Sequence, residues 1–355
     1  EPYRRQRQMC IRDRAMAYYY LGCLLYDRRV YDESIEDYEE SILRSPDFPT
    51  VHRNLALAYY NVKKQPQRAY EEMEKAFALD ETDARVYLEL DQLKKRLNVA
   101  VKERWSDMEK HFDLVESRDD LYLEYVTLLN TLGEPEKALG LIKARKFHQW
   151  EGGEGKVAAQ YLTALYQLAK AAVEKEDYAE AKELLLRAVG EYPHNLGEGK
   201  LESGQENNLY YLLGLVQEKL GEAKDAFESL TRACCGESEP VGMMYYNDQP
   251  PEMIYYQGLA YRMLGEEEQA VRRFQKLVDY GREHIRDDVK IDYFAVSLPD
   301  LLIFEENLNE RNRKHCLFMM SLGLKGLGRI DEAEKCAEEL LAMDNAHQEI
   351  RVHDL

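Results

Sequence analysis

The stretch LTALYQLAKAAVEKEDYAEAKELLLRAVGEYP, residues 162–193, decides the fold of this chain. Its apolar residues recur every three to four positions on both sides of a polar centre, which is the period of two amphipathic helices. The small residues Ala169 and Ala181 let two antiparallel helices approach closely, and Leu185 fills the space that remains. Pro193 ends the second helix. The stretch therefore predicts a tightly packed helix pair.

The same pattern returns along the chain with a period of about 34 residues, and it resembles the tetratricopeptide repeat. Seven of eight units align, and a third unit near residues 83–118 shows only the helical period. The small residues at position 8 of the repeat are Gly22, Ala56, Ala169, Gly214 and Gly258. The resemblance implies an all-α fold, a right-handed superhelical solenoid of about eight helix pairs, and a role in binding rather than catalysis.

Composition narrows the classes of function. The formal net charge of −19 disfavours nucleic acid and anionic membrane surfaces as partners. None of the six cysteines forms a CxxC pair, and no Cys/His cluster has zinc spacing, so we expect neither a metal nor another cofactor. Free cysteines, without a signal peptide or a membrane-length apolar run, predict a cytoplasmic protein.

The first 14 residues look foreign to the protein. The chain begins at Glu1 without a methionine, and Gln8-Met9-Cys10-Ile11-Arg12-Asp13-Arg14 resembles a translated sequencing adapter. A native basic arm, or a helix that continues into Ala15, is the alternative. We assign no function to residues 1–14 and expect native sequence to continue upstream.

The remaining chain divides by the character of its loops. Residues 15–144 hold the N-terminal repeats, and residues 145–355 hold C-terminal repeats that are continuous with them but carry long insertions. The insertions span roughly residues 145–161, 194–206, 236–250 and 282–313. Insertions in a solenoid emerge on one edge, which often binds a ligand. We expect these loops to lie near one another.

A second candidate surface lies inside the repeats. Position 5 of the first helix normally faces the inner groove, and aromatic side chains are favoured at interfaces. Packing against the next helix is an equally weighted alternative. The predicted groove residues are Tyr19, Arg53, Tyr166, Tyr211, Tyr255 and Phe318.

The first insertion combines an aromatic ring with polar groups. His148, Trp150, Glu151 and Glu154 are the components of a sugar site, in which a ring stacks on C–H groups and carboxylates accept hydroxyls. Trp150 plugging a seam between repeats is the alternative. Two Gly-Glu-Gly-Lys segments, which end at Lys156 and Lys200, lack the Ser or Thr of a phosphate-binding loop and predict tight turns.

The later insertions supply polar candidates of weaker character. Glu198 lies in the second Gly-Glu-Gly-Lys segment, and its charge opposes phosphate binding. Paired carboxylates can do acid–base work, but most pairs in so acidic a chain lie on solvated surface, so we predict no catalytic residue. The remaining candidates for the insertion-loop surface are Asn247, Asp248, Asp292, Tyr293 and Asp300.

Four segments are distinctive beyond the repeat pattern: residues 147–156, 195–200, 245–251 and 290–300. With them, the chain from about residue 15 resembles the C-terminal repeat region of a family of large uncharacterised bacterial proteins. The resemblance implies an additional N-terminal domain of unknown function. We expect an interaction scaffold that binds a protein or peptide, including that N-terminal domain. The alternatives are a carbohydrate-active enzyme whose site these loops complete, and a spacer without a specific ligand.

Overall fold

The computed structural model describes residues 2–150, 152–200, 204–242, 248–290 and 303–353, with residues 2–13 described as backbone only. Every regular element among these residues is helical. The elements are α1 (Pro2–Asp27), α2 (Tyr31–Arg44), α3 (Pro49–Asn61), α4 (Pro66–Leu79), α5 (Ala84–Arg96), α6 (Val101–Lys110), α7 (Phe112–Ser117), α8 (Asp119–Thr131), α9 (Pro135–Ala144), α10 (Lys156–Glu174), α11 (Tyr178–Val189), the 3-10 turn η1 (His194–Leu196), α12 (Asn207–Lys219), α13 (Ala223–Ala233), α14 (Pro251–Met263), α15 (Glu267–His284), α16 (Leu308–Gly326), α17 (Ile330–Met343) and α18 (Gln348–Val352).

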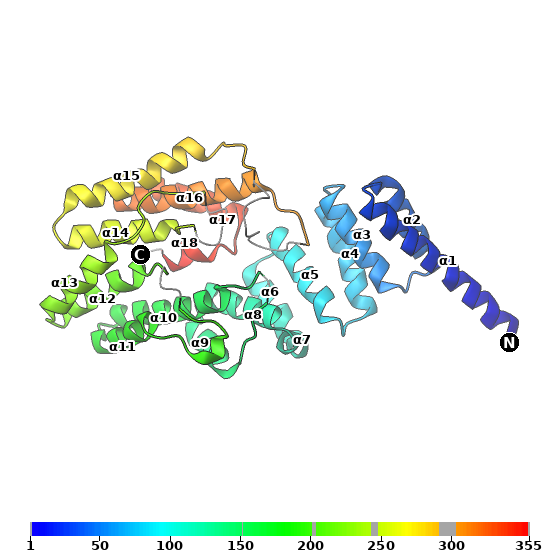
Figure 1. Cartoon of the computed structure of the whole chain (residues 1–355), viewed down its shortest axis with the longest axis horizontal. Helices are drawn as coiled ribbons and strands as arrows, with labels where there is room; N and C mark the ends of the chain where they lie inside the picture. The colour runs from blue at the N-terminus through cyan, green and yellow to red at the C-terminus, as the bar shows by residue number, and fades with distance from the viewer. Residues whose placement is uncertain (1, 151, 201–203, 243–247, 291–302, 354–355) are drawn as a thin grey trace. The chain divides into compact units, whose positions relative to one another are not determined.

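Within the described residues the helices form eight successive pairs, from α1 with α2 to α16 with α17. The third pair, α5 with α6, is followed by the short helix α7, and α18 follows the last pair. Figure 1 shows the pairs in chain order from blue to red. The expected all-α architecture of about eight helix pairs is confirmed.

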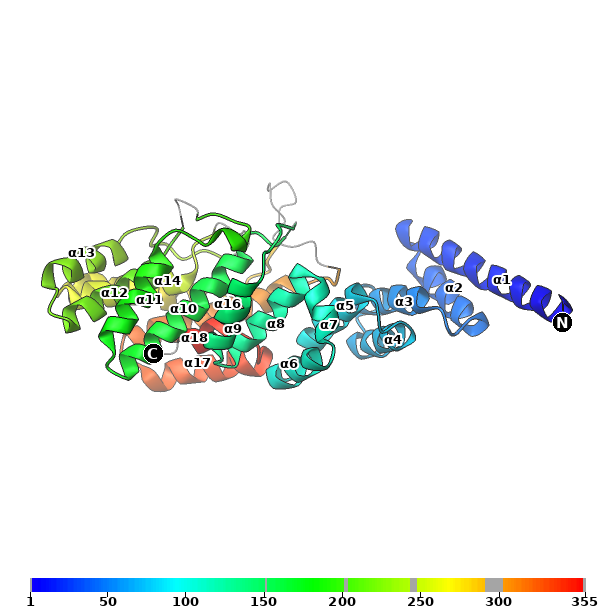
Figure 2. The same ribbon diagram turned by 90° about the horizontal axis from the view of Figure 1, so that it is seen from below.

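The chain forms two compact units. Unit 1 contains residues 1–99, 106–121 and 302–306, and unit 2 contains residues 100–105, 122–301 and 307–355. The sequence changes character later, at residue 145, where the insertions begin. In unit 1, α1 with α2 and α3 with α4 lie as neighbouring pairs (Figure 2).

Local sequence explains where several helices begin and end. Proline occupies the first turn of α3, α4, α9 and α14, where its missing N–H costs no hydrogen bond. Asp83 and Asp177 cap α5 and α11 by accepting backbone N–H groups. At the turn after α14, Gly265 has a φ of 82°, a conformation that favours glycine.

The first pair shows how polar residues replace the usual alanines. Ser34 and Ser41 stand at positions 20 and 27 of the repeat, and both are fully buried. Their hydroxyls donate to Gly22 O at 2.7 Å and to Ala15 O at 2.8 Å, so neither hydroxyl is buried without a partner. The two serines thereby bond the paired helices while remaining small.

Residues 2–14 continue α1 without a break. The helix therefore enters Ala15 as the alternative interpretation of this segment required. The origin of residues 1–14 stays a prediction. Over the part of the chain that the structure describes, no helix has the length and apolarity needed to cross a membrane.

Candidate functional site

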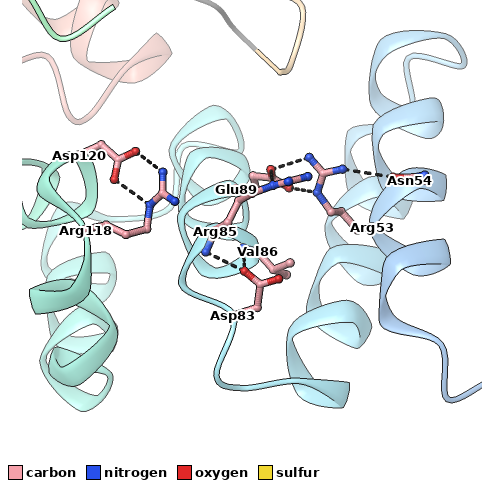
Figure 3. Close-up of polar contacts among 8 residues, drawn as sticks. All are labelled: Arg53, Asn54, Asp83, Arg85, Val86, Glu89, Arg118 and Asp120. Atoms are coloured by element: carbon pink, nitrogen blue, oxygen red, sulfur yellow. Dashed lines mark hydrogen bonds and ion pairs between the residues drawn. The ribbon is translucent and has the colours of Figure 1, made fainter. Parts of the chain in front are cut away.

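Unit 1 carries a buried ion pair between α3 and α5, at the position that the repeat pattern predicts for the inner face. Arg53 donates from Nε to Glu89 Oε2 at 2.5 Å and from Nη2 to Glu89 Oε1 at 2.6 Å. The Glu89 side chain is completely buried, and that of Arg53 is 13% exposed. A third donor of Arg53, Nη1, bonds to Asn54 Oδ1 at 3.2 Å. This planar pairing fixes the Arg53 side chain, which the sequence placed in the groove (Figure 3).

Two more arginines surround this pair. Arg85 donates from Nε to Glu89 Oε1 at 3.1 Å, and its side chain is 56% exposed. Arg118 binds Asp120 through two hydrogen bonds of 3.0 and 2.6 Å. The bond from Asp120, together with the charges of Asp120, Asp83 and Glu89, raises the pKa of Arg118. Figure 3 shows Arg85 on α5, with Arg53 to one side of that helix and Arg118 to the other.

Glu89 therefore serves two guanidinium groups at once. Its single negative charge opposes the positive charges of Arg53 and Arg85, which leaves one positive charge on this trio. Among the described residues the side chain of Arg85 forms one hydrogen bond, from Nε to Glu89, while its backbone N–H donates to Asp83 Oδ1 at 2.9 Å, so its terminal nitrogens are available to a ligand. Tyr19, the other predicted groove residue of unit 1, is half-buried beside Phe48, with 5.0 Å between ring centroids.

In unit 2 the predicted aromatic groove is largely core. Tyr166, Tyr255 and Phe318 are 1%, 3% and 3% exposed, so for these rings the alternative of packing inside the chain holds and an open groove, expected for Tyr166 and Tyr255, is wrong. Of the tyrosines predicted there, Tyr211 is half-buried, with its ring 5.5 Å from that of Tyr256. The position-5 side chains do point inward, but the inner space holds other parts of the same chain.

The helix α18 fills that inner space. Figure 1 shows it between α14 and α10. Gln348 Nε2 donates to Thr127 O and Thr131 Oγ1, each at 3.2 Å, and so reaches α8. Lys170 Nζ on α10 donates to Val352 O at 3.0 Å. The chain's own residues thus occupy the surface that a repeat array commonly offers to a partner.

A row of buried hydrogen bonds joins Tyr166, Tyr256 and His353 beside α18. Tyr166 and Tyr256 share a hydrogen bond of 2.6 Å between their hydroxyls, and Tyr256 Oη lies 3.0 Å from His353 Nδ1. Burial, with a smaller effect from the charge of Lys170, lowers the pKa of His353 to about 3. His353 is therefore neutral near pH 7, and its Nδ1 can accept a hydrogen bond from the Tyr256 hydroxyl.

Two insertion loops meet in unit 2. Phe147 N donates to Asn195 O at 2.8 Å, and the Asn195 amide bonds back to Ile142 O and Arg145 O at 2.8 and 2.9 Å. Gly197 is required at this crossing, because a β-carbon there would lie 2.7 Å from Phe147 O. The structure therefore brings the loops around Trp150 and Gly197 together, as the sequence predicted for all four insertions.

A cavity of about 340 Å³ lies between these loops. The side chains that line it include His148, Gln149, Trp150, Glu154, Val157, Leu196 and Glu198. Four of these were predicted from sequence as members of the insertion-loop surface. His148 and Glu154 are exposed, while Trp150 and Glu198 are half-buried.

The Gly-Glu-Gly-Lys segments build this wall instead of binding phosphate. Glu198 Oε2 accepts Gly155 N, and Glu198 Oε1 accepts Ala158 N, both at 2.7 Å. The carboxylate thus occupies the N-terminus of α10, where an anion would otherwise bind. Lys156 is exposed as the first residue of that helix. Lys200 donates a hydrogen bond of 2.6 Å to Val189 O at the end of α11 and forms an ion pair with Glu206 Oε1 at 2.7 Å.

The third insertion takes a different position. Val241 O accepts a hydrogen bond of 2.8 Å from His315 Nε2 on α16, and Gln249 Nε2 donates to Glu237 O at 2.8 Å. Asp248, in the same insertion, is half-buried and is not a lining residue of the cavity. The predicted residues Glu151, Asn247, Asp292, Tyr293 and Asp300 lie outside the described residues.

Sequence reasoning missed three contributors to these surfaces. Arg85 and Glu89 fall in the degenerate third unit, where no repeat position marked them. Their spacing of four residues on one helix was the available signal. The helix α18 lies beyond the last recognisable repeat, and its five residues are too few to show a period that would predict its inward docking.

Comparisons with known proteins agree with the repeat pattern. A family model described as tetratricopeptide repeat matches residues 14–84 and 166–240, and a second with the same description matches residues 252–280. The repeat models and the eight helix pairs define the class of the fold, an all-helical tetratricopeptide-repeat solenoid. Tetratricopeptide repeats support a role as a protein-interaction scaffold.

Several solved structures are similar to this chain. A tetratricopeptide repeat protein from Parabacteroides merdae ATCC 43184 is 12% identical over 74% of this chain and 92% of that chain, with a TM-score of 0.40. The structure of Naa15/Naa10 bound to HypK-THB is 12% identical over 93% of this chain and 51% of that chain, with a TM-score of 0.37. The TPR2AB-domain:pHSP90 complex of yeast Sti1 is 14% identical over 76% of this chain and 91% of that chain, with a TM-score of 0.32.

Proposed function

We infer that this chain is an interaction scaffold and that the inner face of unit 1 receives a carboxylate-bearing segment of a protein partner. The observation that supports this most is the arrangement of Arg85 over Glu89. Its aliphatic stem and Nε are held in place, while its terminal nitrogens stay open to solvent. A guanidinium fixed in this way can bind a carboxylate through two parallel hydrogen bonds.

The distribution of charge favours this particular place for a partner carboxylate. The formal net charge of the chain is −19, so most of its surface repels an acidic segment. The trio of Arg53, Arg85 and Glu89 carries one net positive charge, and Asn54 beside it offers an amide. A partner carboxylate therefore gains both attraction and hydrogen bonds at this place.

The inner surface of unit 2 is a poorer candidate for a free peptide. Tyr166 and Tyr256 contact His353, the residue directly after α18, and a partner would have to displace this segment first. Displacement carries a free-energy cost that lowers the apparent affinity. We therefore place the partner on unit 1. A domain encoded upstream in the same reading frame is one protein to test there.

The experiment first selects peptides that bind the chain and then measures how substitutions in the chain change their affinity. A displayed library of random 12-residue peptides is selected on the full chain, and the peptides recovered are measured by fluorescence anisotropy. Arg85→Glu should weaken binding by about tenfold to a hundredfold, because charge-assisted hydrogen bonds contribute about 1.5–3 kcal/mol. The affinity of the wild-type chain should also fall with added salt.

A matched charge reversal controls for nonspecific effects. Arg272→Glu changes an equally exposed arginine on α15, whose side chain is 61% exposed and pairs with Glu268. This variant should keep full affinity. If the selected peptides carry no carboxylate preference, or if both variants bind as the wild type does, the proposed site on unit 1 is wrong. Circular dichroism of each variant establishes that the helices are retained.

A further inference from the structure

The cavity between the two insertion loops has a rigid aromatic wall. A β-carbon at Gly153 would lie 2.3 Å from Trp150 Cε2 and 2.5 Å from Trp150 Cδ2, so the indole ring rests on the backbone of Gly153. A hydrogen bond of 3.0 Å from Gly153 N to Trp150 O closes the same turn. The ring therefore packs against the Gly153 backbone and lines the cavity.

The rest of the cavity divides into an apolar part and a polar part. Val157 and Leu196 are 3% and 2% exposed and provide an aliphatic floor next to the indole. His148 and Glu154 are exposed at the cavity, and the Glu154 carboxylate offers an acceptor of hydrogen bonds. Glu198 accepts one backbone N–H on each carboxylate oxygen, which fixes the carboxylate and leaves each oxygen a further lone pair.

The charges of the lining exclude anionic ligands. Glu154 and Glu198 contribute two carboxylates, whereas no lysine or arginine lines the cavity within the described residues. The N-terminus of α10 is already neutralised by Glu198. A phosphate or a carboxylate would therefore meet repulsion without compensation.

A quaternary ammonium ion is also a poor match. Such ions are bound by several aromatic rings that surround the cation, and Trp150 is the one ring among the described lining residues. The imidazole of His148 and the amide of Gln149 are hydrogen-bond donors, which a methylated ammonium group cannot use. The ligand that fits must be neutral, with one apolar face and several hydroxyls.

We propose that this cavity is a binding site for a neutral sugar, with a pyranose ring stacked on Trp150 and its hydroxyls bonded to Glu154 and Glu198. The volume of about 340 Å³ lies at the small end of ligand sites, which range from about 300 to 1,000 Å³, so a monosaccharide or disaccharide is the expected size. The site lies in unit 2 and is independent of the peptide surface proposed on unit 1.

Fluorine NMR tests the proposal directly. The chain has two tryptophans, so labelling with 5-fluorotryptophan gives one resonance for Trp150 and one for Trp105, assigned with the Trp105→Phe variant. The probes are methyl glucoside, methyl galactoside, methyl mannoside, N-acetylglucosamine, maltose and cellobiose, each up to about 10 mM, tenfold above a millimolar Kd. At least one sugar should shift the Trp150 resonance saturably and leave Trp105 unchanged.

Matched variants and probes decide the interpretation. Gly153→Ala should displace the indole and weaken sugar binding at least tenfold, whereas Gly140→Ala, where a β-carbon meets nothing within 4 Å, should bind as the wild type does. Glu154→Gln should weaken binding without altering the helical circular dichroism. The proposal is overturned if no sugar shifts Trp150, if Gly153→Ala binds equally well, or if choline or inorganic phosphate shifts Trp150 and the sugars do not.

Discussion

The α-carbon of Gly258 lies against the ring of Phe274, so closely that a β-carbon on Gly258 would be 2.5 Å from Phe274 Cε1. These residues stand at positions 8 and 24 of one repeat, on α14 and α15. Two other repeats repeat the relationship: the pairs are Gly22 with Tyr38 at 2.8 Å and Gly214 with Leu230 at 2.6 Å. The distance between the paired helices therefore depends on a missing side chain.

Gly258→Ala should destabilise unit 2 by about 1–3 kcal/mol, because the new methyl group must push the Phe274 ring or separate the helices. The measurement is the free energy of unfolding in urea, followed by circular dichroism. Gly140→Ala on α9 is the control, since its β-carbon enters open space. It should leave stability unchanged or raise it by about 0.5–1 kcal/mol through helix propensity. Equal losses in both variants would contradict the packing argument.

This relationship explains why the fold could be predicted from sequence. A close approach at position 8 admits only a small residue, so Gly22, Gly214 and Gly258 repeat visibly along the chain. The helix pairs follow from that local constraint. The third pair lacks it and could be inferred only from its period.

Glu252→Gln should stabilise the chain at alkaline pH. Burial, with a smaller effect from the charge of Glu349, raises the pKa of Glu252 from its usual 4.5 to about 8. The folded state therefore binds a proton more tightly than the unfolded state, and this contribution is lost as pH rises from 4.5 through 8. At pH 8.5 the glutamine variant should be more stable by on the order of 2–4 kcal/mol, and at pH 4 the two proteins should be alike.

The measurement is thermal unfolding of both proteins across that pH range. Glu218→Gln removes an exposed carboxylate from α12 and serves as the control. Its stability should follow the wild type at every pH. A glutamine variant at position 252 that gained nothing above pH 7 would show that Glu252 is charged and solvated in the folded chain.

Removal of residues 348–355 should destabilise unit 2 by about 2–5 kcal/mol. The deletion removes the buried side chains of Ile350 and Val352, and it exposes the inner aromatic residues to water. Thermal unfolding and the binding of an apolar dye report the two effects. An unchanged melting temperature after the longer deletion would mean that α18 contributes no net stability.

Glu198→Ala should cost about 0.5–2 kcal/mol, because it leaves two backbone N–H groups at the start of α10 without their acceptor. Glu154→Ala, an exposed residue of the same cavity, should leave stability unchanged. The comparison uses urea unfolding at neutral pH. If the two alanine variants are equally stable, Glu198 does not cap the helix in solution.

The candidate surfaces were less predictable than the fold, for a physical reason. Trp150 and Glu198 stand out because their loops interrupt a regular repeat. The burial of Tyr166 could not be foreseen, because it depends on Tyr256 and His353, which are 90 and 187 residues away in sequence. Nothing in the local pattern of α10 states whether its inner face meets solvent or another part of the chain.

The inward docking of α18 changes how unit 2 should come apart. In most repeat arrays each repeat contacts only its neighbours, and the ends can fray independently. Here Gln348 bonds to Thr127 across 221 residues and Lys170 bonds to Val352 across 182 residues. These links make the early helices of unit 2 depend on residues that follow them by about 200 positions, so the unit should unfold in one cooperative step and complete its folding only after residue 353 has left the ribosome.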